Sequence, residues 1–374
     1  MYFKFRNPKK VDIVILDNEC DSLLLDYIIK NEFSYKIVES KIDTIFVSPS
    51  IIFKIIKNII KVKNQEKNIL SYLYRIYLLS MINLYNPKII LTYLDNSSLY
   101  HWLIRNDHDM RYMAIQNGIR QKFEFDILEK LIPVKINHDF FFCFGKYDID
   151  FNKRMGFKSN ESIPCGSLKL GISDLRRKEI IKKYDICLLS NYKKRKNISK
   201  CSITREIEEN NILLDEHIKH YCQSNSKSLI IAIRSKNTEE IEYYKSIYGD
   251  DVCFSSGLIE SYSSYDASYQ SEVTIAYQST LLLEMLAVGK KVLHIDFTNN
   301  ESMFNYDAPI KYSFTSYKEM ESKLNNIHDM KIQDYTELTK KQRLYVMNYN
   351  SKNPPHQIIN NKIKFILNNK NYVH

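Results

Sequence analysis

Short apolar runs alternate with amphipathic stretches of helical length along most of the chain. Segments 11–16, 88–93 and 111–115 are runs of this kind, and each is followed by polar or turn-forming residues. Buried strands of parallel sheets show this pattern, because helices cover both faces of such a sheet. The alternation therefore predicts an α/β fold built on parallel, doubly wound sheets.

The same pattern continues towards the end of the chain. The other predicted strands are 44–47, 140–144, 162–165, 185–189, 229–233, 252–254, 273–277 and 292–295. The predicted long helices are 23–30, 51 to about 83, 99–105, 206–223, 238–248, 334–348 and 356–367. Segment 171–183 is charged and poor in apolar residues, so it is predicted to be a linker between two series of elements.

The chain has 374 residues, which is longer than a single hydrophobic core usually extends. The two series of strands and helices therefore indicate two Rossmann-like domains that face a cleft, 1–170 and 171–350, followed by a last helix in 351–374. Ligands bind at the carboxyl ends of the strands in open α/β sheets. The residues directly after each strand are therefore the candidates for chemistry.

The formal net charge of +10 fits acidic partners, such as a nucleotide-activated donor, an anionic glycan or an anionic membrane surface. No nucleic-acid partner is expected, because no recognition motif accompanies the scattered basic residues. The seven cysteines form no C-x-x-C pair and are expected to be free thiols. With no signal-peptide pattern and no membrane-spanning stretch, we expect a cytoplasmic protein, with contact to the inner membrane as an open alternative.

Segment 51–63 has the pattern of a basic amphipathic helix. One face carries isoleucine and the other lysine and asparagine: Ile52, Ile55, Ile56 and Ile59 against Lys54, Lys57, Asn58 and Lys61. The favoured interpretation is an ordinary helix whose isoleucine face packs on the sheet. The alternative is contact with a membrane surface or a lipid acceptor.

Polar residues follow two neighbouring strands of the first half. Asp95 could act as a general base on an acceptor hydroxyl or as a nucleophile. Gln116 and Asn117 offer amide groups to a sugar, and Arg120 can pair with a carboxylate or a phosphate. The alternative is structural: Asp95 caps the next helix, and Asn117 belongs to a turn.

The second half contains a strand, a polar turn, a short helix and a second strand within 271–297. Gln278, Ser279 and Thr280 stand where the helix begins, and a helix N-terminus favours anions such as phosphates. Glu284 follows about one turn later, within reach of a ribose hydroxyl. This segment is predicted to hold a nucleotide or phosphate donor.

Other strand-end residues extend the predicted donor site. Ser167, Ser190 and Arg234 each follow a predicted strand, and an arginine at that position suits a phosphate or a carboxylate. The basic run 193–196 is a solvated loop or, in the minority interpretation, a phosphate-gripping loop. Segment 148–150 has the D-x-D spacing of metal-dependent sugar-nucleotide sites, but this spacing alone is weak evidence. No metal site is expected.

Several runs together resemble a known group of enzymes. T-Y-L-D-N-S-S (92–98), A-I-Q-N-G-I-R (114–120) and I-P-C-G-S (163–167) resemble bacterial surface-carbohydrate biosynthesis transferases. The run A-Y-Q-S-T-L-L-L-E-M-L-A-V-G-K-K-V (276–292) is similar to the donor half of GT-B glycosyltransferases and of Kdo transferases that use CMP-Kdo. The resemblance implies a GT-B fold, an acceptor domain in 1–170, a nucleotide-sugar donor domain in 171–350 and a final helix that returns to the first domain.

The resemblance implies a metal-independent glycosyltransferase that moves a sugar from a nucleotide donor, such as CMP-Kdo or a related CMP-sugar, onto a lipopolysaccharide O-antigen or capsule glycan. Capsule Kdo transferases carry an acidic pair where this chain has Gln116 and Asn117, so Asp95 is left as the carboxylate at the reacting centre. The alternatives are a CDP-glycerol-type glycerophosphotransferase and a non-catalytic GT-B-like binding subunit.

Overall fold

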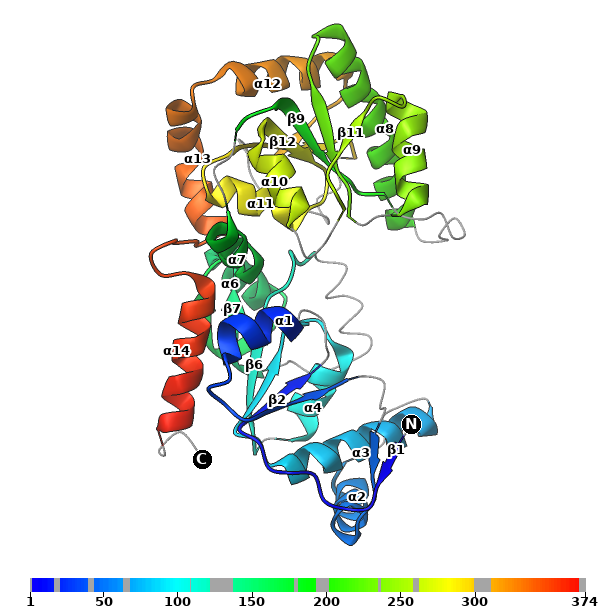
Figure 1. Cartoon of the computed structure of the whole chain (residues 1–374), viewed down its shortest axis with the longest axis vertical. Coiled ribbons are helices and arrows are strands. Elements are labelled where there is room, and N and C mark those ends of the chain that lie inside the picture. The colour runs from blue at the N-terminus through cyan, green and yellow to red at the C-terminus, as the bar shows by residue number, and fades with distance from the viewer. Residues whose placement is uncertain are drawn as a thin grey trace. The chain divides into compact units, whose positions relative to one another are not determined.

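The chain forms two compact units, Met1–Leu168 with Asn350–His374, and Lys169–Tyr349 (Figure 1). This computed structural model describes residues 2–16, 21–39, 44–62, 68–107, 109–121, 137–177, 181–192, 202–234, 237–257, 262–298 and 311–369. None of the helices in these ranges is long and apolar enough to cross a membrane.

The first unit is built on a six-stranded sheet in which every strand pair is parallel. In spatial order its strands are β3 (Tyr35–Val38), β2 (Ile13–Leu16), β5 (Ile89–Thr92), β6 (Arg111–Ile115), β7 (Asn137–Cys143) and β8 (Lys158–Pro164). Its helical elements are α1 (Asp21–Leu24), the π-helix η1 (Leu25–Ile29), α2 (Pro49–Lys61), α3 (Ile69–Tyr85), α4 (Ser98–Asn106), α6 (Lys146–Arg154) and α14 (Pro355–Asn368). The apolar runs of β2 and β5 are fully buried, as central parallel strands require.

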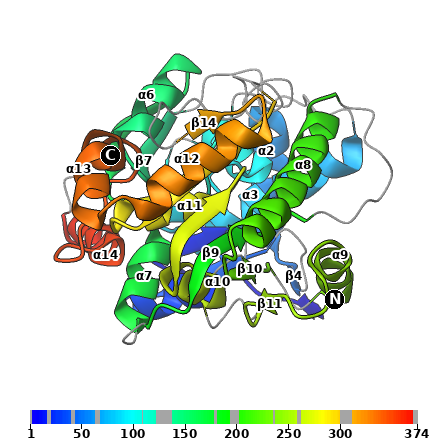
Figure 2. The same ribbon diagram turned by 90° about the horizontal axis from the view of Figure 1, so that it is seen from above.

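The second unit repeats this design. Its parallel strands, in spatial order, are β11 (Cys253–Phe254), β10 (Leu229–Ala232), β9 (Tyr184–Leu189), β12 (Ser271–Ala276), β13 (Lys291–Asp296) and β14 (Lys311–Ser313). Its helices are α7 (Leu168–Arg176), α8 (Ser202–Ser224), α9 (Thr238–Tyr248), α10 (Ser263–Tyr269), α11 (Thr280–Ala287), α12 (Tyr317–Asp329) and α13 (Ile332–Val346). Helix α10 packs on β9, β10 and β12, and α12 packs on β12 and β13 (Figure 2).

The last helix, α14, belongs to the first unit although the second unit precedes it in the chain. It packs on η1, where its Ile359, Ile363 and Ile366 are buried. The Asn360 side-chain amide donates a hydrogen bond to the backbone carbonyl of Ile28. The predicted return of the C-terminal helix to the first half of the chain is confirmed.

The predicted linker 171–183 is wrong over its first part, because α7 occupies Leu168–Arg176. Leu168, Leu170 and Ile172 are fully buried. Leu168 and Leu170 precede segment 171–183, so the apolar face of α7 could not be recognised from that segment alone. Asp174 of α7 accepts a hydrogen bond from the Tyr349 hydroxyl at 2.7 Å, which joins the two ends of the second unit.

Near the N-terminus, the extent of one predicted helix is wrong, whereas the predicted strand 44–47 is confirmed as a strand. The single long helix from 51 to about 83 is two helices, α2 and α3. The strand predicted at 44–47 is β4 (Thr44–Phe46), which pairs with β1 (Tyr2–Lys4) in a separate two-stranded sheet. The edge of the main sheet is instead β3, whose half-exposed residues lack a continuous apolar run.

The favoured packing of helix 51–63 is also wrong. Ile52, Ile56 and Ile59 of α2 are exposed, whereas Ile51, Asn58 and Val62 are buried. The helix therefore turns a different stripe of residues towards α3 than the sequence pattern indicated, because the buried Asn58 donates hydrogen bonds to the Ser80 hydroxyl at 2.9 Å and to Asn83 at 3.3 Å.

Candidate active site

In the first unit, the loops after β5 and β6 bring together three of the residues predicted to be catalytic. Asp95 follows β5, and Asn117 and Arg120 follow the neighbouring strand β6. The Arg120 guanidinium pairs with both oxygens of Asp95, with Nε donating to Oδ2 at 2.9 Å and Nη2 donating to Oδ1. The Asn117 backbone N–H donates to Asp95 Oδ1 at 3.3 Å, and Arg120 Nη2 donates to Asn117 Oδ1 at 2.5 Å.

The Asp95–Arg120 pair is largely removed from solvent. The side chains of Arg120 and Asp95 are 9% and 7% exposed. A buried carboxylate and guanidinium compensate each other's charge, and their two parallel hydrogen bonds hold both groups in one orientation. The structure therefore presents Asp95 as an oriented, charge-compensated carboxylate rather than as an isolated one.

The fourth predicted residue, Gln116, joins another carboxyl group to this region. Its Oε1 accepts from the Phe144 backbone N–H at 3.0 Å, and its Nε2 donates to Asp148 Oδ1 at 2.7 Å. Asp148 lies in the first turn of α6, where Oδ2 accepts from the Gly145 N–H at 3.1 Å. Burial raises the pKa of Asp148 to about 7, and the charge of Asp95 acts in the same direction, whereas the Gln116 hydrogen bond opposes the shift. Asp148 thus changes protonation near neutral pH.

Asp148 is not among the site residues predicted from the sequence, and its D-x-D spacing with Asp150 carried little weight there. The sequence feature that indicates a role for Asp148 is its position three residues after Gly145, the N-cap of α6 that follows β7. An acidic residue at that position accepts backbone N–H groups at a helix N-terminus, and the helix then begins at the functional edge of the sheet.

In the second unit, the ends of β9 and β10 place Ser190 beside Arg234. The Ser190 hydroxyl donates to Oε1 of the buried Glu240 at 2.5 Å and accepts from the Tyr244 hydroxyl at 3.1 Å. The Arg234 backbone N–H donates to the same Glu240 oxygen at 3.2 Å. The Arg234 guanidinium donates to the Ser190 carbonyl at 3.3 Å and to Asn191 Oδ1 at 3.4 Å.

Arg234 differs from Arg120 in its charge environment. Its side chain is exposed. Within the described ranges, its guanidinium contacts only neutral acceptors, and no carboxylate there forms an ion pair with it. A guanidinium with no carboxylate partner among the described residues, at the carboxyl edge of a Rossmann-like sheet, is suited to bind a phosphate.

Gln278 and Ser279 lie between β12 and α11, Thr280 is the first residue of α11, and β12 is the neighbour of β9 in the sheet. Ser279 is the N-cap of α11, but its side chain does not cap the helix. By contrast, Ser48 of α2 and Ser316 of α12 accept from backbone N–H groups of their own helices. The first turn of α11 therefore has no side-chain cap from its N-cap residue, which suits an anionic ligand.

Glu284 lies further along α11 and is only 3% exposed. Its Oε2 accepts a hydrogen bond from the Tyr265 hydroxyl of α10 at 2.6 Å. This hydrogen bond links α11 to α10 within the second unit. Glu284 thus has a structural partner in addition to its predicted contact with a ribose.

Ser167 belongs to a different unit from the other donor-site candidates. It is buried and follows β8, the edge strand of the first unit. The six other predicted donor-site residues belong to the second unit. The basic run 193–196 lies outside the described residues.

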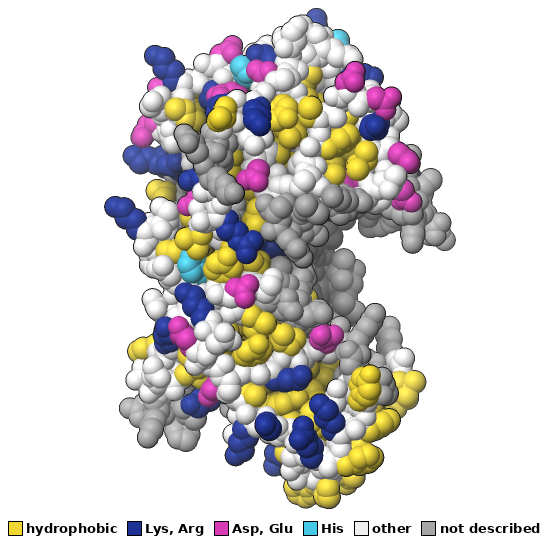
Figure 3. Space-filling model, in the orientation of Figure 1, with side chains coloured by type: hydrophobic (Ala, Val, Ile, Leu, Met, Phe, Trp, Pro, Cys, Tyr) yellow, Lys and Arg dark blue, Asp and Glu magenta, His cyan; other side chains and the backbone are white. Residues whose placement is uncertain are grey.

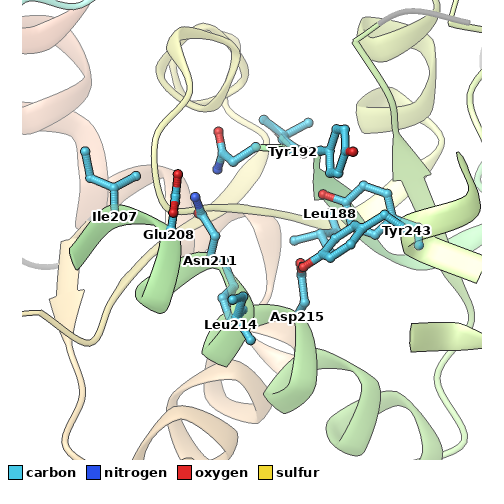
Figure 4. A pocket seen from close by; sticks show the side chains of 12 residues that line it. Leu188, Tyr192, Ile207, Glu208, Asn211, Leu214, Asp215 and Tyr243 are labelled. Atoms are coloured by element: carbon cyan, nitrogen blue, oxygen red, sulfur yellow. The ribbon is translucent and has the colours of Figure 1, made fainter. Parts of the chain in front are cut away.

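A cavity of about 50 Å³ opens in the second unit between β9, α8 and α9 (Figure 4). Asn191 and Tyr192, directly after Ser190, contribute to its lining. The Tyr243 hydroxyl donates to Asp215 Oδ2 in this cavity at 2.8 Å, and burial raises the pKa of Asp215 to about 7. No sequence pattern indicated this cavity, because its lining residues come from three separate elements.

In the described part of the chain, no group of three or more His, Cys, Asp or Glu could hold a metal ion.

Two Rossmann-like units with parallel six-stranded sheets, and a last helix that returns to the first unit, define a GT-B fold. The fold class predicted from the sequence is confirmed.

A family model described as an O-antigen biosynthesis protein matches residues 113–371, and the chain belongs to that family. The predicted resemblance to surface-carbohydrate biosynthesis proteins is confirmed at this level. No curated protein matches the chain.

Solved structures of the same fold cover nearly the whole chain. The S. aureus protein MnaA in complex with UDP has a TM-score of 0.55 at 14% identity, over 96% of this chain and 97% of MnaA. A Listeria monocytogenes protein described as a UDP-N-acetylglucosamine 2-epimerase has a TM-score of 0.53 at 11% identity, over 96% and 95%. The wall teichoic acid polymerase TagF has a TM-score of 0.52 at 10% identity, over 95% and 89%. At these identities the likeness concerns the fold.

Proposed function

We propose that this protein is a glycosyltransferase that moves a sugar from a nucleotide-activated donor onto a bacterial surface glycan. The GT-B fold and the O-antigen biosynthesis family support the reaction class. The observation that carries the proposal is Arg234, an exposed guanidinium held by Ser190 and Asn191 at the end of β9, the strand that pairs with β12. That arrangement suits the diphosphate or phosphate of an activated donor.

The donor side of the proposal has a direct test. Arg234→Ala should raise the donor dissociation constant by about 10-fold to 100-fold, because a charge-assisted hydrogen bond is lost. Ser279→Ala should weaken the donor as well. The thermal unfolding midpoint should not change in either variant. Lys340→Ala, which removes an exposed charge on α13, is the matched control. Equal donor affinity in wild type and Arg234→Ala would contradict the donor-site assignment.

The reacting centre of the proposal is Asp95. An acceptor hydroxyl attacks the anomeric carbon, the bond from that carbon to the nucleotide phosphate breaks, and the nucleotide leaves with the electron pair. Asp95 takes the hydroxyl proton, while Arg120 orients its carboxylate and Asn117 holds the sugar. Gln116, predicted to contact the sugar as well, is buried and directs its amide N–H groups to Asp148 and Gly118, so it positions the loop after β6 instead. An inverting outcome accompanies this role of Asp95, whereas a nucleophilic Asp95 gives retention.

The donor can be identified by thermal-shift measurements with CMP-, UDP-, GDP- and dTDP-linked sugars, because a ligand that binds only the folded state raises its stability. CMP-Kdo or a related CMP-sugar is the donor proposed from the sequence resemblance. A transferred product that contains phosphorus would instead support CDP-glycerol-type glycerophosphotransfer. Donor binding without turnover, over a panel of O-antigen and capsule acceptors, would support a non-catalytic binding subunit.

The proposal includes the setting of the reaction. Transfer requires no metal ion, and the protein works in the cytoplasm, where nucleotide-sugars are available, with a lipid-linked glycan as acceptor. Cell fractionation tests the location: the protein should be found in cytosol and inner-membrane fractions, and recovery in the periplasm alone would contradict it.

A further inference from the structure

Helix α2 exposes most of its apolar residues. The exposed fractions are 52% for Ile52, 68% for Phe53, 53% for Ile56 and 82% for Ile60. Large apolar side chains that remain exposed together on a folded domain usually mark a binding surface, because burying them elsewhere would stabilise the fold. The stripe of α2 that packs on α3 is narrow and includes the polar Asn58.

Two neighbouring elements extend this exposed face. Of the large hydrophobic residues that are exposed in the described chain, eleven lie in β1 and the residue after it, α2 and the start of α3: Tyr2, Phe3, Phe5, Ile52, Phe53, Ile56, Ile59, Ile60, Ile69, Leu70 and Leu73. We call this set the α2 surface.

The parts of the α2 surface are held together by hydrogen bonds. The Ser48 hydroxyl at the N-cap of α2 donates to Asn7 Oδ1 at 2.6 Å, close to β1. The Tyr72 hydroxyl of α3 donates to the Val62 carbonyl, at the end of α2, at 2.8 Å. The three elements thus form one continuous part of the first unit, visible as yellow side chains at its lower end in Figure 3.

In the two described segments that carry β1 and α2, all charged side chains are positive. Residues 2–10 and 44–62 contain seven Lys or Arg and no Asp or Glu: Lys4, Arg6, Lys9, Lys10, Lys54, Lys57 and Lys61. Dark-blue side chains lie beside the yellow ones at this end of the molecule (Figure 3). An exposed apolar face bordered by lysine is the arrangement that lies in the interface of an anionic membrane.

We propose that the α2 surface docks the protein on an anionic phospholipid membrane, with the apolar side chains among the acyl chains and the basic side chains at the headgroups. Both signals act together, since apolar insertion and headgroup attraction are each weak alone. A second copy of the chain is the poorer occupant, because a two-fold contact of this surface with itself would bring its seven positive charges face to face.

Vesicle flotation tests the docking. The wild-type protein should float with vesicles of phosphatidylcholine and phosphatidylglycerol, and far less with vesicles of phosphatidylcholine alone. Phe53→Ser/Ile60→Ser should weaken binding at least about tenfold, because two exposed apolar side chains no longer insert. Lys54→Glu/Lys57→Glu/Lys61→Glu should weaken it about fivefold for each lysine, and high salt should have a similar effect.

The matched control is Leu338→Ser/Leu344→Ser, which removes two apolar side chains that are 52% and 55% exposed on α13 of the second unit. It should float like the wild type. The proposal is overturned if the wild type binds neither vesicle, if Phe53→Ser/Ile60→Ser binds as well as the control, or if sedimentation shows a dimer that Phe53→Ser/Ile60→Ser dissociates. No donor is present in these measurements, so their outcome is independent of the proposed transferase activity.

Discussion

Removing one charge of the Asp95–Arg120 pair is expected to destabilise the protein more than removing both. In Asp95→Asn, the Arg120 guanidinium stays buried without its counter-charge, and in Arg120→Gln the Asp95 carboxylate does. Because the two side chains are only 7% and 9% exposed, each single change should cost about 3–5 kcal/mol of unfolding free energy. The double variant Asp95→Asn/Arg120→Gln contains no buried charge and should lose less than either single variant.

Thermal unfolding and donor transfer are measured on the same four proteins. For a unit of this size, about 1 kcal/mol corresponds to roughly 2–4 °C in the unfolding midpoint, so each single variant should unfold about 6–20 °C below the wild type. If Asp95 is the reacting carboxylate, the double variant should recover stability but remain at least about 100-fold slower in transfer.

Two results would refute this reasoning. Single variants that unfold within a few degrees of the wild type would show that the pair is not a buried ion pair, and parallel recovery of stability and transfer in the double variant would make Asp95 a structural residue. The exposed pair Lys364–Glu32, with an N–O distance of 2.8 Å and side chains 42% and 37% exposed, is the control. Neutralising Glu32 and Lys364 with glutamine should leave the midpoint almost unchanged.

Three further predictions concern other residues and a metal ion. The pKa of Asp148 in the folded state is raised to about 7, so the folded protein keeps a proton that the unfolded chain releases near pH 4. The free energy of unfolding of the wild type should therefore fall as pH rises from about 4 to about 7. Calorimetry should therefore show Asp148→Asn gaining stability relative to the wild type across this window; a constant difference would contradict the raised pKa. Tyr265→Phe leaves the buried Glu284 without its 2.6 Å hydrogen bond and should cost about 1–3 kcal/mol in urea unfolding, whereas an unchanged midpoint would mean that the bond is not formed. EDTA should leave the transfer rate unchanged, and a loss that Mg²⁺ restores would overturn the metal-independent mechanism.

Much of the candidate site could be anticipated from strand ends. Asp95 and Arg120 are 25 residues apart in the chain, yet each follows a strand of the same parallel sheet, so their meeting at one edge follows from topology. Their mutual ion pair could not be anticipated, because it depends on how the two loops fold over each other. Asp148 and Glu240 were missed for a related reason, since their roles come from burial beside Gln116 and Ser190 rather than from any motif.

The amino-acid sequence by itself determined the two series of parallel strands, the polar residues that follow them and the helix-forming pattern of 51–63, since these depend on periodicity and on the preferences of neighbouring residues. Only the tertiary structure decided which charged side chains have a partner of opposite charge and which face of a helix is buried. Arg120 is paired with Asp95, whereas Arg234 contacts no carboxylate in the described part of the chain, and α2 turns Asn58 inward and Phe53 outward. The physical reason is that charge compensation and burial arise from residues far apart in the chain, which local sequence patterns do not specify.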